Sequence, residues 1–110
     1  MRGGQGSRSV EGGVYAQVTT FRVEPGKLDE VAGRVRETLA PAVAQQRGHR
    51  GGLLLTDRAT GKVLAISLWE TEADLRAAEP AGGYREVLGL LLGVVPGSAV
   101  QETYEVRLRT

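Results

Sequence analysis

The chain has 110 residues, 41% of them hydrophobic and 25% charged, which is the composition of an ordinary globular protein and fits a single domain. Its formal net charge of +1 gives no electrostatic basis for binding nucleic acid or an acidic membrane surface, so we expect neither partner. The chain contains no cysteine, which excludes disulfides, thiolate metal sites and thiol nucleophiles and favours the reducing cytoplasm as its location.

The first 13 residues, "MRGGQGSRSVEGG", include five glycines and no apolar run. Such a segment buries too little apolar surface to offset the entropy of ordering it, and it lacks the apolar centre of a signal peptide. The longest apolar run of the chain, residues 87–95, is much too short to cross a bilayer. We therefore expect a flexible glycine-rich tail over residues 1–13, a folded domain over residues 14–110 and no membrane partner.

Residues 14–23 alternate between two faces and are rich in β-branched and aromatic side chains, which predicts a strand. After a turn at "EPGK", apolar residues recur at helical spacing: Leu28, Val31, Val35, Leu39 and Ala42. Pro41 should kink or interrupt this helix near its end. The stretch "RGHRGG", residues 47–52, should then break it, with Gly48 as a left-handed cap.

Two short apolar runs, residues 53–57 and 62–70, predict a hairpin whose turn lies near Gly61. The sequence "TEAD" at residues 71–74 resembles a capping box and should start a second helical region. Beyond it the pattern predicts two further elements, a helix over residues 84–94 and a strand over residues 100–108.

The predicted order is β-α-β-β-α-β, the ferredoxin-like arrangement of an α+β fold, in which helices cover one face of a four-stranded antiparallel sheet. The strands over residues 14–23 and 62–70 nevertheless carry apolar side chains on both faces. An uncovered apolar sheet face is unfavourable in a soluble monomer. We therefore expect a second copy of the chain to cover it, in a symmetric face-to-face homodimer.

Four segments of the chain resemble the antibiotic biosynthesis monooxygenase superfamily: "YAQVTTFRVEPGKLDEV", "GHRGGLLL", "ISLWETEADL" and "VQETYEV". The most recognisable piece is the pattern W-E-[S/T]-x-x-x-L, which begins at Trp69. The resemblance extends over residues 14–109 and implies a dimeric α+β barrel, in which two ferredoxin-like domains pack together.

The resemblance implies two kinds of enzyme, namely cofactor-free monooxygenases that oxidise anthrone-type polyketides to quinones, and heme-degrading monooxygenases. In both, the tryptophan that matches Trp69 lines the ligand cavity between sheet and helices. Quinone-forming members carry an asparagine and a tyrosine at the positions of Ala65 and Leu75. Heme-degrading members use a histidine on the second helix and an asparagine in the first strand, whereas residues 76–86 contain no histidine and the chain contains no asparagine.

The candidate pocket comprises five residues: Trp69, His49, Tyr84, Phe21 and Ser67. Trp69 is expected to anchor a strand end and to form a cavity wall, two roles that are compatible. His49 is the only histidine, the residue type that exchanges a proton most readily near neutral pH, and its alternative role is packing within a loop. Ser67 lies in mid-strand without the glycines of a nucleophile elbow, so we do not interpret it as a nucleophile with His49 and Asp57.

Three functions remain open. The sequence contains no metal or flavin motif, so we expect no metal and no cofactor. The first is a cofactor-independent monooxygenase of an electron-rich aromatic such as an anthrone or hydroquinone, which supplies its own electrons to oxygen once deprotonated. Trp69 would shape its pocket, with Tyr84 or His49 as a polar partner. The second is a non-catalytic or regulatory dimeric module that holds a small apolar or aromatic ligand. The third is heme binding and degradation.

Overall fold

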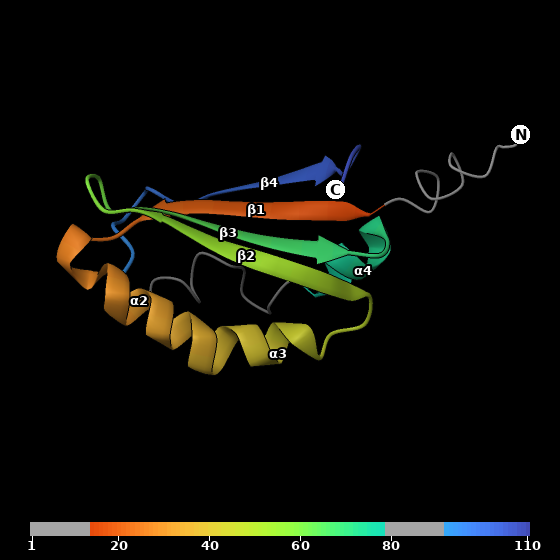
Figure 1. Ribbon diagram of the computed structural model, residues 1–110, viewed down its shortest axis with the longest axis horizontal. Coiled ribbons are helices and arrows are strands. Elements are labelled where there is room, and N and C mark those ends of the chain that lie inside the picture. Colours follow the sequence, from red (N-terminus) through yellow and green to blue (C-terminus); the bar gives the residue numbers. More distant parts are fainter. Residues whose placement is uncertain (1–13, 79–91) are drawn as a thin grey trace, which may run out of the picture.

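The computed structural model describes residues 14–78 and 92–110 of the chain. In these residues four strands form one antiparallel sheet in the order β2-β3-β1-β4 (Figure 1). Helices α2, α3 and α4 lie on one side of this sheet (Figure 1). The arrangement is the α+β ferredoxin-like fold that the sequence predicts. The bounds of the strands are Tyr15–Arg22 for β1, His49–Asp57 for β2, Lys62–Trp69 for β3 and Val100–Glu105 for β4.

One continuous helical segment connects β1 to β2, in four successive parts: η1 (Pro25–Lys27), α2 (Leu28–Arg34), the π-helical η2 (Val35–Leu39) and α3 (Ala40–Ala44). The segment runs through Pro41 instead of ending there, so the predicted interruption takes the form of a changed hydrogen-bond pattern. A proline cannot donate to the carbonyl four residues back, and its ring collides with that carbonyl. The wider π turn just before Pro41, in which the Ala40 amide donates to the Val35 carbonyl, accommodates the proline.

Strand β2 begins at His49, so the prediction of a break over all of residues 47–52 is wrong from residue 49 onward. The pairing of β2 with β3 shifts register between His49 and Gly52, which marks a β-bulge. Gly52 lies so close to β3 that a Cβ there would come within 2.7 Å of the Ile66 carbonyl oxygen. The glycines therefore belong to a bulged strand. Gly48 does adopt the left-handed conformation, at φ 82°, and its carbonyl accepts a 2.7 Å bond from the Glu70 amide.

The turn and cap that follow agree with the sequence. Gly61 has a φ of 79° in the β2–β3 hairpin, and its amide donates to the Asp57 carbonyl at 2.9 Å. Helix α4 covers Glu72–Ala77, and the Thr71 hydroxyl accepts from the Asp74 amide at 3.0 Å. This bond is the N-cap that "TEAD" predicts.

Two predicted segments lie wholly or mostly outside the residues that the structure describes. The tail over residues 1–13 lies outside them, as does most of the helix predicted over residues 84–94. Strand β4 begins at Val100 as expected and ends at Glu105, before the predicted end at residue 108.

The two faces of the sheet differ in what covers them. The helix-facing side carries Phe21 and Trp69, which are 1% and 2% exposed. Around Phe21 the buried core comprises Val23, Leu28, Val31, Val63, Leu92 and Ala99. The opposite side, called the open face below, carries four exposed apolar side chains: Leu53, Leu55, Val100 and Tyr104, which are 61%, 46%, 48% and 49% exposed. The apolar character of both faces is as predicted from the sequence.

Candidate functional site

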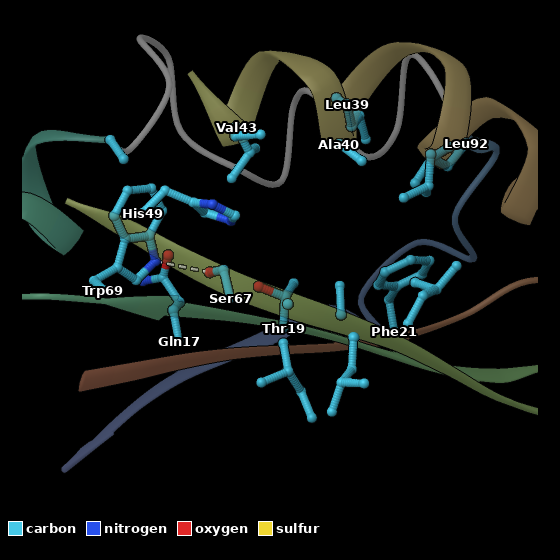
Figure 2. Close-up of a pocket in the computed structure, with 18 residues that line it drawn as sticks. Gln17, Thr19, Phe21, Leu39, Ala40, Val43, His49, Ser67, Trp69 and Leu92 are labelled. Carbon is cyan, nitrogen blue, oxygen red and sulfur yellow. Dashed lines mark hydrogen bonds between the residues drawn. The ribbon is translucent and has the colours of Figure 1, made fainter. Parts of the chain in front are cut away.

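A cavity of about 440 Å³ lies between the sheet and the helical segment η2–α3 (Figure 2). Strands β1 and β3 contribute most of its floor through Gln17, Thr19, Phe21, Ala65, Ser67 and Trp69. The helical segment contributes its roof through Val35, Leu39, Ala40, Val43 and Ala44. A volume of this size falls within the range of small-molecule sites, which is about 300–1,000 Å³.

The strand register explains why these floor residues share one side. Strand β1 pairs antiparallel with β3, so that Gln17 lies opposite Ser67, Thr19 opposite Ala65 and Tyr15 opposite Trp69. Since directly opposed residues of an antiparallel pair point to the same face, odd-numbered residues of both strands point toward the helices. The register thus brings residues about fifty positions apart in sequence onto one surface.

Trp69 forms one end wall of the cavity. Its side chain is 2% exposed, and its indole N–H donates to the Ser67 Oγ at 2.9 Å (Figure 2). A buried indole needs such a partner, because an unpaired N–H away from water is costly. Trp69 is therefore both a packed core residue and part of the cavity surface.

His49 lies beside Trp69 at the same end of the cavity. It is the register partner of Trp69 at the start of β2, and the two rings meet edge to face with centroids 5.4 Å apart and planes at 80°. Its side chain is half-buried and reaches over the cavity (Figure 2). The bulge after His49 fixes this position. An ion pair of 2.8 Å between Arg50 and Glu70 joins β2 to the end of β3 nearby.

The cavity is polar at one end and apolar at the other. Gln17, Ser67 and His49 gather next to Trp69, whereas Phe21 and Leu92 lie at the far end (Figure 2). Between them, the Thr19 Oγ1 accepts from the Gln101 Nε2 at 3.0 Å, so that this buried hydroxyl has a partner on β4. Such a gradient suits a flat ring system that carries a polar substituent at one edge.

Four of the five residues predicted for the pocket line this cavity, namely Trp69, His49, Phe21 and Ser67. The fifth, Tyr84, lies outside the described residues. Gln17 and Thr19 also line the cavity but are absent from the predicted pocket, although their alternation with Phe21 along one strand places all three on one face.

Asp57 at the end of β2 and Tyr104 of β4 lie away from the cavity. Asp57 ends β2 at the end opposite to His49, and its carboxylate accepts from the Ala59 amide at 2.9 Å in the hairpin turn, so no Ser67–His49–Asp57 triad forms. Tyr104 lies on the open face, where its hydrogen bond with Glu102 raises the pKa of the phenol above its usual value.

No metal-binding or membrane-spanning feature is present in the described part of the chain. Within residues 14–78 and 92–110, no three His, Cys, Asp or Glu side chains come together where they could hold a metal ion. None of the helices in those ranges is both long and apolar enough to cross a membrane.

Known proteins show the same fold. A monooxygenase of Streptomyces coelicolor, solved in complex with the ligand nanaomycin D, superposes with a TM-score of 0.68 at 18% identity over 89% of this chain and 90% of its own. A heme-degrading protein of Mycobacterium tuberculosis, solved free of heme, gives a TM-score of 0.64 at 21% identity over 89% of this chain and 96% of its own.

Sequence comparison gives a more specific relation. An uncharacterised protein of Mycobacterium tuberculosis is 34% identical over 96 residues, which cover 86% of this chain. The matched region spans only 39% of that relative's length. The sequence profile described as "antibiotic biosynthesis monooxygenase" matches residues 14–88, well over half of the chain. The chain therefore belongs to the antibiotic biosynthesis monooxygenase family.

Proposed function

We propose that this protein is a cofactor-independent monooxygenase that oxidises an electron-rich aromatic substrate of the anthrone or hydroquinone type. The observation that carries the proposal is the cavity of about 440 Å³ between sheet and helices, apolar over most of its surface and polar beside Trp69. Membership of the monooxygenase family supports it. So does the likeness of the fold to a monooxygenase that was solved with the ligand nanaomycin D.

The reaction requires no redox group of the protein. Anthrone and one O₂ give anthraquinone and one water, so that one oxygen atom enters the substrate, the other is reduced to water, and the methylene carbon loses both hydrogens. The substrate supplies all the electrons once a proton leaves that carbon. The protein need only bind the ring system, exclude water and stabilise the enolate.

The described residues offer groups for these tasks. His49 lies at the polar end of the cavity and is the candidate acceptor of the substrate proton. Trp69 would hold the ring system in place, and Phe21 and Leu39 would surround its far edge.

Oxygen consumption tests the proposal. Anthrone is added to the aerobic protein, and O₂ uptake and quinone absorbance are followed against a protein-free control that measures autoxidation. We expect uptake proportional to protein concentration, and at least a tenfold slower rate for His49→Phe, which keeps a ring against Trp69 but cannot accept a proton (about 1.4 kcal/mol in barrier height). Uptake at the autoxidation rate throughout would contradict the proposal.

A second candidate is a module that binds an aromatic ligand without turnover. It is favoured by two apolar residues at positions where the quinone-forming enzymes that this chain resembles carry polar groups. Ala65 exposes only a methyl group to the cavity, and Leu75 is buried at 2% exposure. Quenching of Trp69 fluorescence by anthrone without O₂ uptake would establish this function instead. A hemin titration in the same series, read by its Soret band, tests heme binding at His49.

We also propose that two copies of the chain pair through their open faces. This proposal is supported by the four exposed apolar side chains on a sheet face that no helix of the described residues covers: Leu53, Leu55, Val100 and Tyr104.

A further inference from the structure

The side chain of Gln17 ends in an amide group that borders the cavity. Gln17 lies in the middle of β1, its side chain is half-buried, and it lines the cavity floor beside Ser67 (Figure 2). In residues 14–78 and 92–110 no hydrogen bond is formed by its side-chain amide. The amide carries two N–H donors, which are therefore available to a ligand in the cavity.

The Ser67 hydroxyl also has a hydrogen that it can donate to a ligand. A serine hydroxyl has one hydrogen and two lone pairs. One lone pair accepts the 2.9 Å bond from the Trp69 indole, which leaves the hydroxyl hydrogen for another acceptor. A hydroxyl that already accepts a hydrogen bond is a better donor, because successive bonds in a chain polarise one another. Ser67 can therefore donate to a third atom while it accepts from the Trp69 indole.

Gln17 and Ser67 can serve the same atom. They are register partners in the β1–β3 pair, and directly opposed residues have Cβ atoms about 5 Å apart on the same face of the sheet. Both groups border one cavity, and both can donate, Gln17 through its Nε2 and Ser67 through its Oγ. Two converging donors form a site for a single oxygen acceptor.

We infer that Gln17 and Ser67 together bind a carbonyl or enolate oxygen on the edge of the aromatic ligand. The inference rests on the proposed function and adds to it the ligand's orientation and chemical class. With the oxygen held at this end, beside His49, the rings extend toward Phe21 and Leu39. Hydrocarbons without that oxygen would bind without orientation.

A pair of ligands that differ only in the oxygen tests this inference. We choose 1-tetralone, a bicyclic aromatic ketone, and tetralin, the hydrocarbon of the same skeleton, because neither is oxidised during the measurement. Trp69 is the only tryptophan, so the protein has one indole N–H resonance in a ¹H–¹⁵N spectrum. Titration of this resonance gives Kd for both ligands and reports directly on the bond to Ser67.

We expect Gln17→Met, which keeps the length of the side chain and removes its donors, to raise Kd for 1-tetralone about tenfold and to leave Kd for tetralin within twofold of the wild type. Gln17→Glu should weaken 1-tetralone further, since a carboxylate repels the ketone oxygen. The matched control is Gln101→Met, another glutamine on the helix-facing side whose amide is already bonded to Thr19. This control should discriminate between the ligands as the wild type does.

The indole resonance provides a second readout. Binding of 1-tetralone should move the indole proton downfield relative to tetralin, because Ser67 becomes a better acceptor when it donates to the ketone. Equal Kd changes for both ligands in Gln17→Met would overturn the inference and leave the proposed function standing. Failure of the wild type to bind either ligand would count against the proposed function itself, and the inference would fall with it.

Discussion

At the scale of single residues, the arrangement of Trp69, Ser67 and His49 determines what the polar end of the cavity can do. The indole is held by one hydrogen bond and by an edge-to-face contact with His49. A ring fixed in this way forms a rigid wall, and rigid walls orient a ligand without an entropic cost at the moment of binding. Substitutions here should therefore change both stability and binding.

Ser67→Ala is expected to lower the free energy of unfolding by about 1–3 kcal/mol, because it leaves the buried indole N–H of Trp69 without an acceptor. Urea unfolding followed by circular dichroism measures the change, since this signal does not depend on Trp69. In a Trp69→Phe background the same substitution should cost much less, since the unsatisfied donor is then absent. Equal costs in the two backgrounds would show that the hydrogen bond contributes nothing to stability.

Part of this site could be predicted from the sequence. Trp69 lies in a recognisable motif, and His49 is the only histidine of the chain, so each could be predicted as a pocket residue by itself. Gln17 was not predicted, because a lone glutamine in a strand has no motif, and its role depends on Ser67 lying opposite it in the sheet. Alternation along a strand assigns each residue to a face, but a slip of two residues between β1 and β3 would keep the same faces, so alternation alone does not show that Gln17 lies opposite Ser67.

At the scale of elements, the backbone conformations of glycines account for most of the differences between the predicted and observed boundaries. The glycines after His49 suggest a loop, yet they form the bulged start of β2, where Gly51 has a φ of 119°. A pair of glycines indicates unusual backbone geometry, which occurs both in loops and in β-bulges. Pro41 is a parallel case, because the π turn absorbs the proline within the helix.

Two glycine-to-alanine substitutions should have opposite effects on the melting temperature. Gly61→Ala should lower Tm, because φ is 79° there and a Cβ would collide with the Val23 carbonyl. Gly33→Ala should raise Tm, because this glycine lies within α2, nothing lies within 4 Å of a Cβ there, and alanine is favoured in a helix by about 0.5–1 kcal/mol. Scanning calorimetry measures both. A fall in Tm for Gly33→Ala would contradict the helical assignment at that residue.

At the scale of the whole molecule, the fold divides the sheet into a face that holds the cavity and a face that carries exposed apolar side chains. The sequence predicted this division well, since strict alternation along β1 and β3 assigns each residue to a side. The volume of the cavity could not be predicted, because it depends on the distance between helix and sheet. Side-chain packing sets this distance, and local pattern does not determine it.

The double substitution Leu53→Glu with Leu55→Glu should convert a dimer to a monomer. Both side chains are exposed on the open face, and four buried carboxylates per dimer would meet across a symmetric interface. Sedimentation velocity measures the mass. Arg36→Glu, an exposed position on the helical segment, is the control and should remain dimeric. A wild-type protein that sediments as a monomer would refute the pairing of the open faces.

The most direct test of the proposed function is oxygen uptake with anthrone when the cavity is filled from its own floor. Ala65 lines the cavity between Thr19 and Leu54, so Ala65→Phe should place a ring where the substrate lies. The wild type should consume one O₂ per anthrone at a rate proportional to protein concentration. A folded Ala65→Phe should show only the rate of autoxidation. Equal rates for the two proteins would show that oxidation does not take place in this cavity.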